Sequence, residues 1–314
     1  MLLFSFLIVS GLCLLTYGSD ALVRGAEALA LRLGLPPLVL GLTIVAWGTS
    51  SPELVVSIQS SLNSQPDIAL GNVIGSNIFN VCIILGITAL ICPIACDRQI
   101  LRFDMPFMIG VSVMMVYLLA DGSLSRVESI AFVCVLVAYT GWLIVSGLKQ
   151  PVAEDEGLKD ALQPKTSQTI FMELVQVILG LVLLVIGSEL LLKGAIGMAR
   201  AYELSEAIIG LTIVAAGTSM PELATSVTAA LKNSPGIAIG NVVGSNIFNI
   251  LGILGLTGCV LPLQAGNITT VDLGMALGSS LFLWPLLYSQ SKLSRSEGVL
   301  LIGLYLGYLS WIWP

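Results

Sequence analysis

Long apolar runs separated by short polar segments recur along the whole chain. A helix needs about 20 apolar residues to cross a bilayer, because each residue adds about 1.5 Å. By this measure the first half contains predicted helices at 2–30, 36–62, 69–93, 104–120 and 126–148, and the second half at 170–200, 205–231, 238–262, 272–289 and 294–313. The pattern predicts an all-α polytopic membrane protein with ten transmembrane helices.

The polar residues within these runs repeat at a spacing of 169 residues, the difference between 210 and 41. GLTIVAWGTSSPE at 41–53 recurs as GLTIVAAGTSMPE at 210–222, and GNVIGSNIFN at 71–80 recurs as GNVVGSNIFN at 240–249. A repeat of this length indicates one structural unit used twice. With five helices per unit, the second unit enters the membrane from the opposite side. The chain is therefore expected to form two inverted-topology repeats, as secondary transporters do.

The repeat also sets the expected boundaries and orientation. The first five-helix repeat covers 1–148, a polar linker covers 149–169, and the second repeat covers 170–314. Because 1–17 aligns with 170–186, it is expected to be a retained membrane helix and not a cleaved signal. Ten basic residues share the face of the linker and three lie on the other face: Arg24, Arg32, Arg98, Arg102, Lys149, Lys159, Lys165, Lys232, Lys292 and Arg295 against Arg126, Lys193 and Arg200. The positive-inside rule then predicts a multi-pass protein of the cytoplasmic (inner) membrane, with the linker in the cytoplasm and both termini outside.

Composition excludes several classes of protein. Hydrophobic residues make up 56% of the chain and charged residues only 10%, whereas soluble domains carry about 25% charged residues. The chain has no histidine, which disfavours zinc hydrolases, catalytic triads and haem proteins. A net charge of −6 argues against a nucleic-acid partner. The six cysteines show no C-x-x-C spacing and are expected to be small buried side chains. No enzymatic activity and no cofactor are expected.

One acid lies within the second predicted helix of each half, Glu53 in the first and Glu222 in the second. An ionisable side chain at membrane depth costs about 2.5–3.5 kcal/mol, so its repetition in the same context indicates a function. Each acid follows a proline, Pro52 or Pro221, which lacks an N–H and breaks the helical hydrogen-bond ladder. The helix is therefore expected to open at Gly48-Thr49-Ser50 and Gly217-Thr218-Ser219, and to turn the carbonyls of Ala46 and Ala215 toward a cavity.

The surrounding side chains supply further oxygen atoms. Ser76 and Asn80 in the third helix are four residues apart and share a face, as do Ser245 and Asn249. Carboxylate, amide, hydroxyl and carbonyl oxygens together favour hard cations such as Ca²⁺ and Na⁺, and one Ca²⁺ balances the two acids. Hydroxyl groups also serve helix packing, and the residues leave open whether the neighbouring amides of Asn72, Asn77, Asn241 and Asn246 take part.

These motifs resemble the two alpha repeats of the calcium:cation antiporter superfamily, in particular the small prokaryotic members of its sodium/calcium exchanger branch. The resemblance rests on G-T-S-x-P-E followed by G-S-N-I-F-N in both halves and spans nearly the whole chain. It implies a Ca²⁺ site formed by Glu53, Glu222, Asn80 and Asn249. It also implies that Na⁺ is bound mainly by Thr49, Ser50, Ser76, Thr218, Ser219 and Ser245, with the carbonyls of Ala46 and Ala215.

Two departures from the family limit what the resemblance implies. Some members, including potassium-dependent ones, carry Asp where this chain has Asn249, so K⁺ transport is not expected. The short linker has no room for the calcium-sensing domain of animal exchangers.

The expected function is antiport of Na⁺ and Ca²⁺ by alternating access, with an electrogenic exchange that exports Ca²⁺. H⁺/Ca²⁺ antiport on the same fold is the alternative, since both acids can carry protons. A passive cation channel and an intramembrane enzyme are disfavoured by the opposed repeats and by the missing histidine. The expected partners are the transported ions and the lipid bilayer, and the sequence indicates no protein partner.

Overall fold

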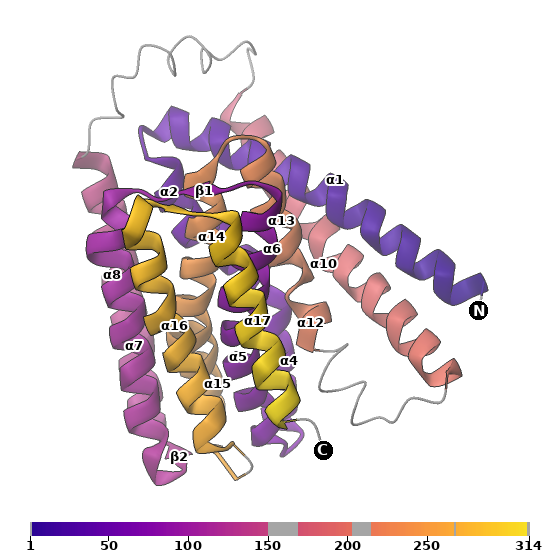
Figure 1. The fold of residues 1–314 in the computed structure, drawn as a ribbon, viewed down its shortest axis with the longest axis vertical. Coiled ribbons are helices and arrows are strands. Elements are labelled where there is room, and N and C mark those ends of the chain that lie inside the picture. Colours follow the sequence, from indigo (N-terminus) through magenta and orange to yellow (C-terminus); the bar gives the residue numbers. More distant parts are fainter. Residues whose placement is uncertain (1, 150–168, 203–214, 267, 313–314) are drawn as a thin grey trace.

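The computed structural model describes residues 2–149, 169–202, 215–266 and 268–312, and these residues form a helical bundle (Figure 1). In the first half the helical segments are α1 (Leu2–Leu33), α2 (Pro37–Leu40), η1 (Gly41–Val45), α3 (Ala46–Thr49), α4 (Ser51–Leu62), α5 (Pro66–Phe79), η2 (Asn80–Ile84), α6 (Leu85–Ile91), η3 (Ile100–Asp104), α7 (Met105–Leu118), η4 (Leu119–Asp121) and α8 (Arg126–Lys149). In the second half they are α10 (Ile170–Ala201), α12 (Ala215–Thr218), α13 (Met220–Leu231), α14 (Pro235–Phe248), η6 (Asn249–Leu254), α15 (Gly255–Val260), α16 (Thr270–Gln290) and α17 (Arg295–Ile312).

Within the described residues, seven helices are long and apolar enough to cross a membrane, and the bent pair at 37–62 makes an eighth. This finding confirms an all-helical, polytopic membrane protein. The observed helices follow the predicted ranges closely, because the apolar runs that fill them are continuous. The predicted helix at 205–231 is described from Ala215 onward, and its start lies outside the described residues, as does most of the linker at 149–169.

The long helices α1 and α10 pack against each other along much of their length and run obliquely beside the other helices (Figure 1). Glycines permit this close approach: a Cβ atom added at Gly180 would lie 2.6 Å from the Leu22 backbone nitrogen and 2.8 Å from the Gly18 carbonyl oxygen. At one end of the pair, the Arg32 guanidinium donates two hydrogen bonds of 2.7 Å to the Glu173 carboxylate. Small residues are a common means of close helix packing in membranes.

The centre of the bundle is formed by the helices that carry the repeated asparagines. Every residue of α14 from Ile237 to Phe248 is buried. The backbone then changes from α-helical to π-helical hydrogen bonding at Asn249, and the same change occurs after α5 at Asn80. Single π-helical turns are often found at functional sites. These turns were not predicted from the sequence.

Four short strands connect the two halves of the chain near the helix ends. β1 (Ile94–Ala95) pairs with β4 (Lys292–Leu293) in antiparallel register. β2 (Ser123–Leu124) pairs with β3 (Leu263–Gln264) in the same way. Each ladder joins one half to the other, and the two ladders are related by the 169-residue offset.

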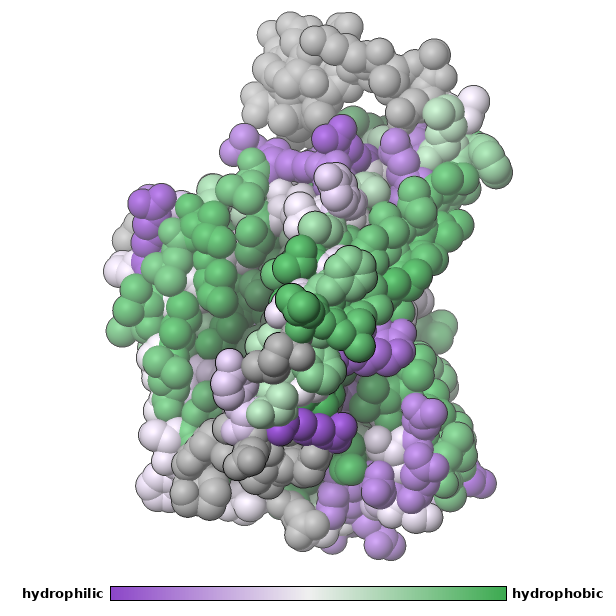
Figure 2. Space-filling view, turned by 90° about the vertical axis from the view of Figure 1, so that its right-hand side faces the viewer, coloured by the Kyte–Doolittle hydropathy of each residue, from purple (hydrophilic) through white to green (hydrophobic). Residues whose placement is uncertain are grey.

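The surface facing the viewer in Figure 2 is apolar across its middle, and hydrophilic residues gather toward its upper and lower parts. Large apolar side chains are exposed on the helices, among them Phe6, Val137 and Phe171. The cysteines follow the prediction only in part, since Cys82 and Cys96 are buried whereas Cys13 and Cys134 are exposed. This distribution is that of a protein whose helices face lipid.

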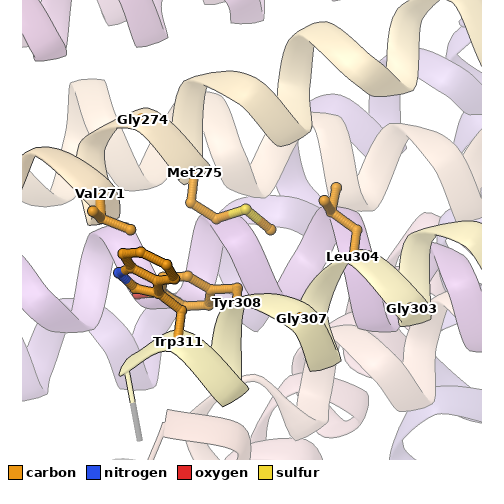
Figure 3. Close-up of a pocket in the computed structure, with 8 residues that line it drawn as sticks. All are labelled: Val271, Gly274, Met275, Gly303, Leu304, Gly307, Tyr308 and Trp311. Carbon is orange, nitrogen blue, oxygen red and sulfur yellow. The ribbon is translucent and has the colours of Figure 1, made fainter.

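A pocket of about 500 Å³ lies between α16 and α17 (Figure 3). Its lining is mostly apolar and consists of Val271, Gly274, Met275, Gly303, Leu304, Gly307, Tyr308 and Trp311. The Tyr308 hydroxyl donates to Asp272 Oδ1 at 2.7 Å. The lining includes none of the predicted ion ligands, so this pocket is separate from the candidate site.

Candidate cation-binding site

Both repeated acids lie in the first turn of a helix that begins at a break. The helix axis bends by 45° between Thr49 and Ser51, and Ser50 at the break has φ −81° and ψ 8°. Ser219 has nearly the same backbone angles, φ −88° and ψ 11°. The predicted opening is therefore confirmed. A proline in the first turn begins each new helix, and the positive end of that helix favours the acid that follows.

The Ala46 carbonyl is not freed at the helix break. This oxygen keeps its helical hydrogen bond, from the Ser50 N–H at 3.0 Å. The carbonyl that loses its helical partner to a proline lies four residues before it, which is Gly48 in the first half and Gly217 in the second. The Gly217 oxygen instead accepts a hydrogen bond of 2.7 Å from the Ser188 hydroxyl on α10. Ala215 is the first residue of α12, and its side chain is outside what the structure describes.

The two acids meet in one centre and are held crosswise. The Ser50 hydroxyl donates to Glu222 Oε1 at 2.8 Å, and the Ser219 hydroxyl donates to Glu53 Oε1 at 3.1 Å. Ser76 Oγ lies 3.3 Å from Ser219 Oγ. Each acid is 1% exposed. Each serine at a helix break therefore orients the acid that belongs to the other half of the chain.

Asn80 and Asn249 each donate a hydrogen bond from the amide nitrogen to an asparagine of the other half. Asn80 Nδ2 donates to Asn246 Oδ1 at 3.0 Å, and Asn249 Nδ2 donates to Asn77 Oδ1 at 2.9 Å. Both Asn80 and Asn249 are 1% exposed and are the first residues of the π-helical turns. Their amide oxygens remain available as acceptors.

Four buried oxygens from these residues have no hydrogen-bond partner: Glu53 Oε2, Glu222 Oε2, Asn80 Oδ1 and Asn249 Oδ1. A buried polar atom without a partner destabilises a protein by about 1–3 kcal/mol, so four such atoms need an explanation. Two belong to carboxylates and two to amides, and each half of the chain supplies one of each. This is a set of hard oxygen donors shielded from water.

The remaining predicted residues lie around this centre. The buried Thr49 hydroxyl lies 3.2 Å from the Ala46 oxygen and 3.1 Å from Asn241 Oδ1. The Ser245 hydroxyl reaches the Ala46 oxygen from α14 at 3.4 Å. Thr218 is 3% exposed. Hydroxyls from both halves thus meet at the Ala46 carbonyl, close to the first helix break.

Several residues around the site were not assigned a role from the sequence. Asn72 donates to the Glu53 carbonyl at 3.1 Å, and its counterpart Asn241 donates to the Glu222 carbonyl at 3.2 Å. Their repetition was the available signal, but it did not distinguish support of the acids from helix packing. Ser188 repeats Ser19 of the first half, but the sequence did not indicate its contact with the Gly217 carbonyl.

Comparison with known proteins agrees with the sequence motifs and the fold. Residues 3–145 and 172–313 match the sodium/calcium exchanger protein family. The chain is 37% identical over 318 residues to the putative antiporter CaxA of Alkalimonas amylolytica, with 98% of each chain covered. It is 34% identical to the inner membrane protein YrbG of Escherichia coli (strain K12), covering 100% of this chain and 99% of the relative. A solved structure of the sodium-calcium exchanger NCX_Mj, soaked with Na⁺ and Sr²⁺, has a TM-score of 0.85 and 32% identity, covering 98% of both chains. The chain therefore belongs to the sodium/calcium exchanger family of the calcium:cation antiporter superfamily, a family of membrane transporters.

Proposed function

We propose that this protein exchanges Na⁺ for Ca²⁺ across the cytoplasmic membrane by alternating access. The observation that carries the proposal is the set of four unpaired buried oxygens, two of them from carboxylates. One Ca²⁺ placed among them would give each oxygen a partner and balance the charge of the two acids. Ca²⁺ accepts 6–8 oxygen ligands in flexible geometry, which suits a mixed set of carboxylates and amides.

The hydroxyl groups are proposed to bind Na⁺ beside this centre. Ser50 and Ser219 already contact the acids, and Ser76 lies next to Ser219. Thr49, Thr218 and Ser245, with the carbonyls of Ala46 and Ala215, are proposed to supply the further Na⁺ ligands. Na⁺ bound at the shared acids would exclude Ca²⁺, and this competition is what an exchanger requires.

The proposed architecture is ten transmembrane helices in two inverted repeats, 1–148 and 170–314, joined by the linker 149–169. The reciprocal strand ladders between the halves support it. So does the crosswise pairing of each break serine with the acid of the other half. Opposed repeats around a shared central site are the usual basis of alternating access. In the proposed orientation the linker lies in the cytoplasm and both termini lie outside. Exchange by alternating access requires no enzymatic step and no bound cofactor.

Coupling to protons is the second candidate function, and the observation in its favour is that each acid keeps one free carboxylate oxygen. The test is ⁴⁵Ca²⁺ uptake into proteoliposomes that contain the purified protein. We expect an outward Na⁺ gradient at equal pH to drive uptake, and an imposed pH gradient without Na⁺ to drive none. Uptake that follows the pH gradient and ignores Na⁺ would assign the protein to H⁺/Ca²⁺ antiport. Flux that neither gradient drives would overturn both.

A further inference from the structure

The proposed amide ligands are held by a second pair of asparagines that the sequence left without a role. Asn77 lies one helical turn before Asn80, and Asn246 lies one turn before Asn249. Asn77 is 4% exposed and Asn246 is 1% exposed, so water does not compete for the hydrogen bonds that their side chains form. Four hydrogen bonds connect these four residues across the two halves of the chain, two between side chains and two from a side chain to a main-chain carbonyl.

The main-chain carbonyls fix the direction of every hydrogen bond in this network. Asn77 Nδ2 donates to the Asn246 carbonyl oxygen at 3.3 Å, and Asn246 Nδ2 donates to the Asn77 carbonyl oxygen at 3.3 Å. A main-chain carbonyl has no hydrogen, so the side-chain atom that faces it must be the NH₂ group. The oxygen of each of these amides must then point the other way. The assignment of oxygen and nitrogen in Asn77 and Asn246 follows from this network.

The same constraint passes to the proposed ligands. Asn77 Oδ1 faces Asn249 at 2.9 Å, and an amide oxygen can only accept, so Asn249 must present its NH₂ group to Asn77. Asn249 Oδ1 therefore points away from Asn77, and it is one of the four unpaired oxygens. Asn246 acts on Asn80 in the same way, with Asn246 Oδ1 and Asn80 Nδ2 3.0 Å apart.

We infer that Asn77 and Asn246 are positioning residues that keep the oxygen atoms of Asn249 and Asn80 directed at the bound cation. This inference rests on the proposed cation site. Without Asn77, the amide of Asn249 is free to turn by 180° and to present N–H groups, which repel a cation, in place of the oxygen. Each positioning residue acts on an amide of the other half. Asn77 of the first half orients Asn249 of the second, and Asn246 of the second half orients Asn80 of the first.

The crossed pairing predicts a specific pattern of energetic coupling. Asn77→Ala should raise the Kd for Ca²⁺ about tenfold to hundredfold, the usual effect of removing a residue that orients a metal ligand. In an Asn249→Ala background the same substitution should change the Kd less than about twofold, because no amide remains for Asn77 to orient. In an Asn80→Ala background it should keep its full effect. Asn246→Ala should show the reverse pattern, coupled to Asn80→Ala and not to Asn249→Ala.

The experiment is equilibrium binding of ⁴⁵Ca²⁺ to the purified full-length protein in detergent without Na⁺, with the melting temperature of each variant recorded. Asn77→Leu, which is similar in shape and cannot hydrogen bond, replaces Asn77→Ala if the latter does not fold. A purely structural role would weaken binding by the same factor in all three backgrounds, and that outcome overturns the inference while leaving the cation site intact. Wild-type protein that binds no ⁴⁵Ca²⁺ would instead overturn the proposed Ca²⁺ site on which the inference rests.

Discussion

Replacing either central acid by glutamine should weaken Ca²⁺ binding at least about tenfold without unfolding the protein. In Glu53→Gln the amide oxygen can still accept the hydrogen bond that Ser219 donates to Glu53 Oε1. The NH₂ group then takes the place of the unpaired Oε2, so its hydrogens point to where the cation is proposed to bind. The substitution therefore removes one negative charge and turns one ligand into a donor.

The size of the effect follows from the distance and the charge. Ca²⁺ lies about 2.4 Å from its oxygen ligands. At an effective dielectric constant of about 20, one carboxylate at that distance contributes about 14 kcal/mol of gross attraction to a divalent ion. Protons or Na⁺ that occupy the site in the absence of Ca²⁺ offset most of this attraction. Even a residual tenth, about 1.4 kcal/mol, is tenfold in Kd, so we expect the Kd to rise at least about tenfold.

The assay is ⁴⁵Ca²⁺ binding and Na⁺-driven ⁴⁵Ca²⁺ uptake, measured for Glu53→Gln and Glu222→Gln. Glu189→Gln is a matched control, because Glu189 is an exposed acid on α10 that pairs with Lys193. It loses the same charge outside the site and should keep its Kd within about twofold. A folded Glu53→Gln or Glu222→Gln protein with wild-type affinity would show that the acid is not a ligand and would refute the reasoning.

Three further predictions concern packing, charge movement and topology. Gly180→Ala should lower the melting temperature in detergent, since overpacking costs about 1–3 kcal/mol. The control Gly110→Ala should not lower it, because nothing lies within 4 Å of the added Cβ. Equal melting temperatures for the two variants would contradict the close contact of α1 and α10. If three Na⁺ exchange for one Ca²⁺, a membrane potential of 100 mV should bias the exchange equilibrium by about 2.3 kcal/mol, or nearly fiftyfold. The test is ⁴⁵Ca²⁺ flux in proteoliposomes whose potential is set with K⁺ and valinomycin. Flux that does not respond to the potential would indicate an electroneutral exchange. Gly157→Cys, in a background without the native cysteines, should react with an impermeant thiol reagent only after permeabilisation, and labelling in intact cells would reverse the proposed orientation.

The sequence was sufficient to predict the apolar helices and to single out residues that the structure brings close together. Continuous apolar runs defined the helix ranges, and the duplicated Pro-Glu motif identified Glu53, Glu222 and the breaks before them. A proline removes the same hydrogen bond in any helix, so the position of the break could be derived from local chemistry. The structure places the predicted acids, hydroxyls and amides together because the two halves pack face to face.

The contacts between the halves could not be predicted from spacing. Nothing in the sequence states that Ser50 binds Glu222 instead of Glu53, because both choices fit the same helical pattern. The π-helical turns at Asn80 and Asn249 have no residue signature, since they change the hydrogen-bond partners and not the residue types. The two-residue strands join segments that are far apart in the chain and too short to show an alternating pattern. The partners of the Ala46 carbonyl likewise depend on α14, which reaches it from the other half.

The most direct test of the central claim is a crystal structure of the protein soaked with Ca²⁺, with anomalous data collected at long wavelength to locate the ion. The account predicts one strong peak between the two helix breaks, about 2.3–2.6 Å from Glu53 Oε2, Glu222 Oε2, Asn80 Oδ1 and Asn249 Oδ1. High Na⁺ in the soak should remove that peak. A Ca²⁺ peak elsewhere, with these four oxygens still unoccupied, would contradict the account.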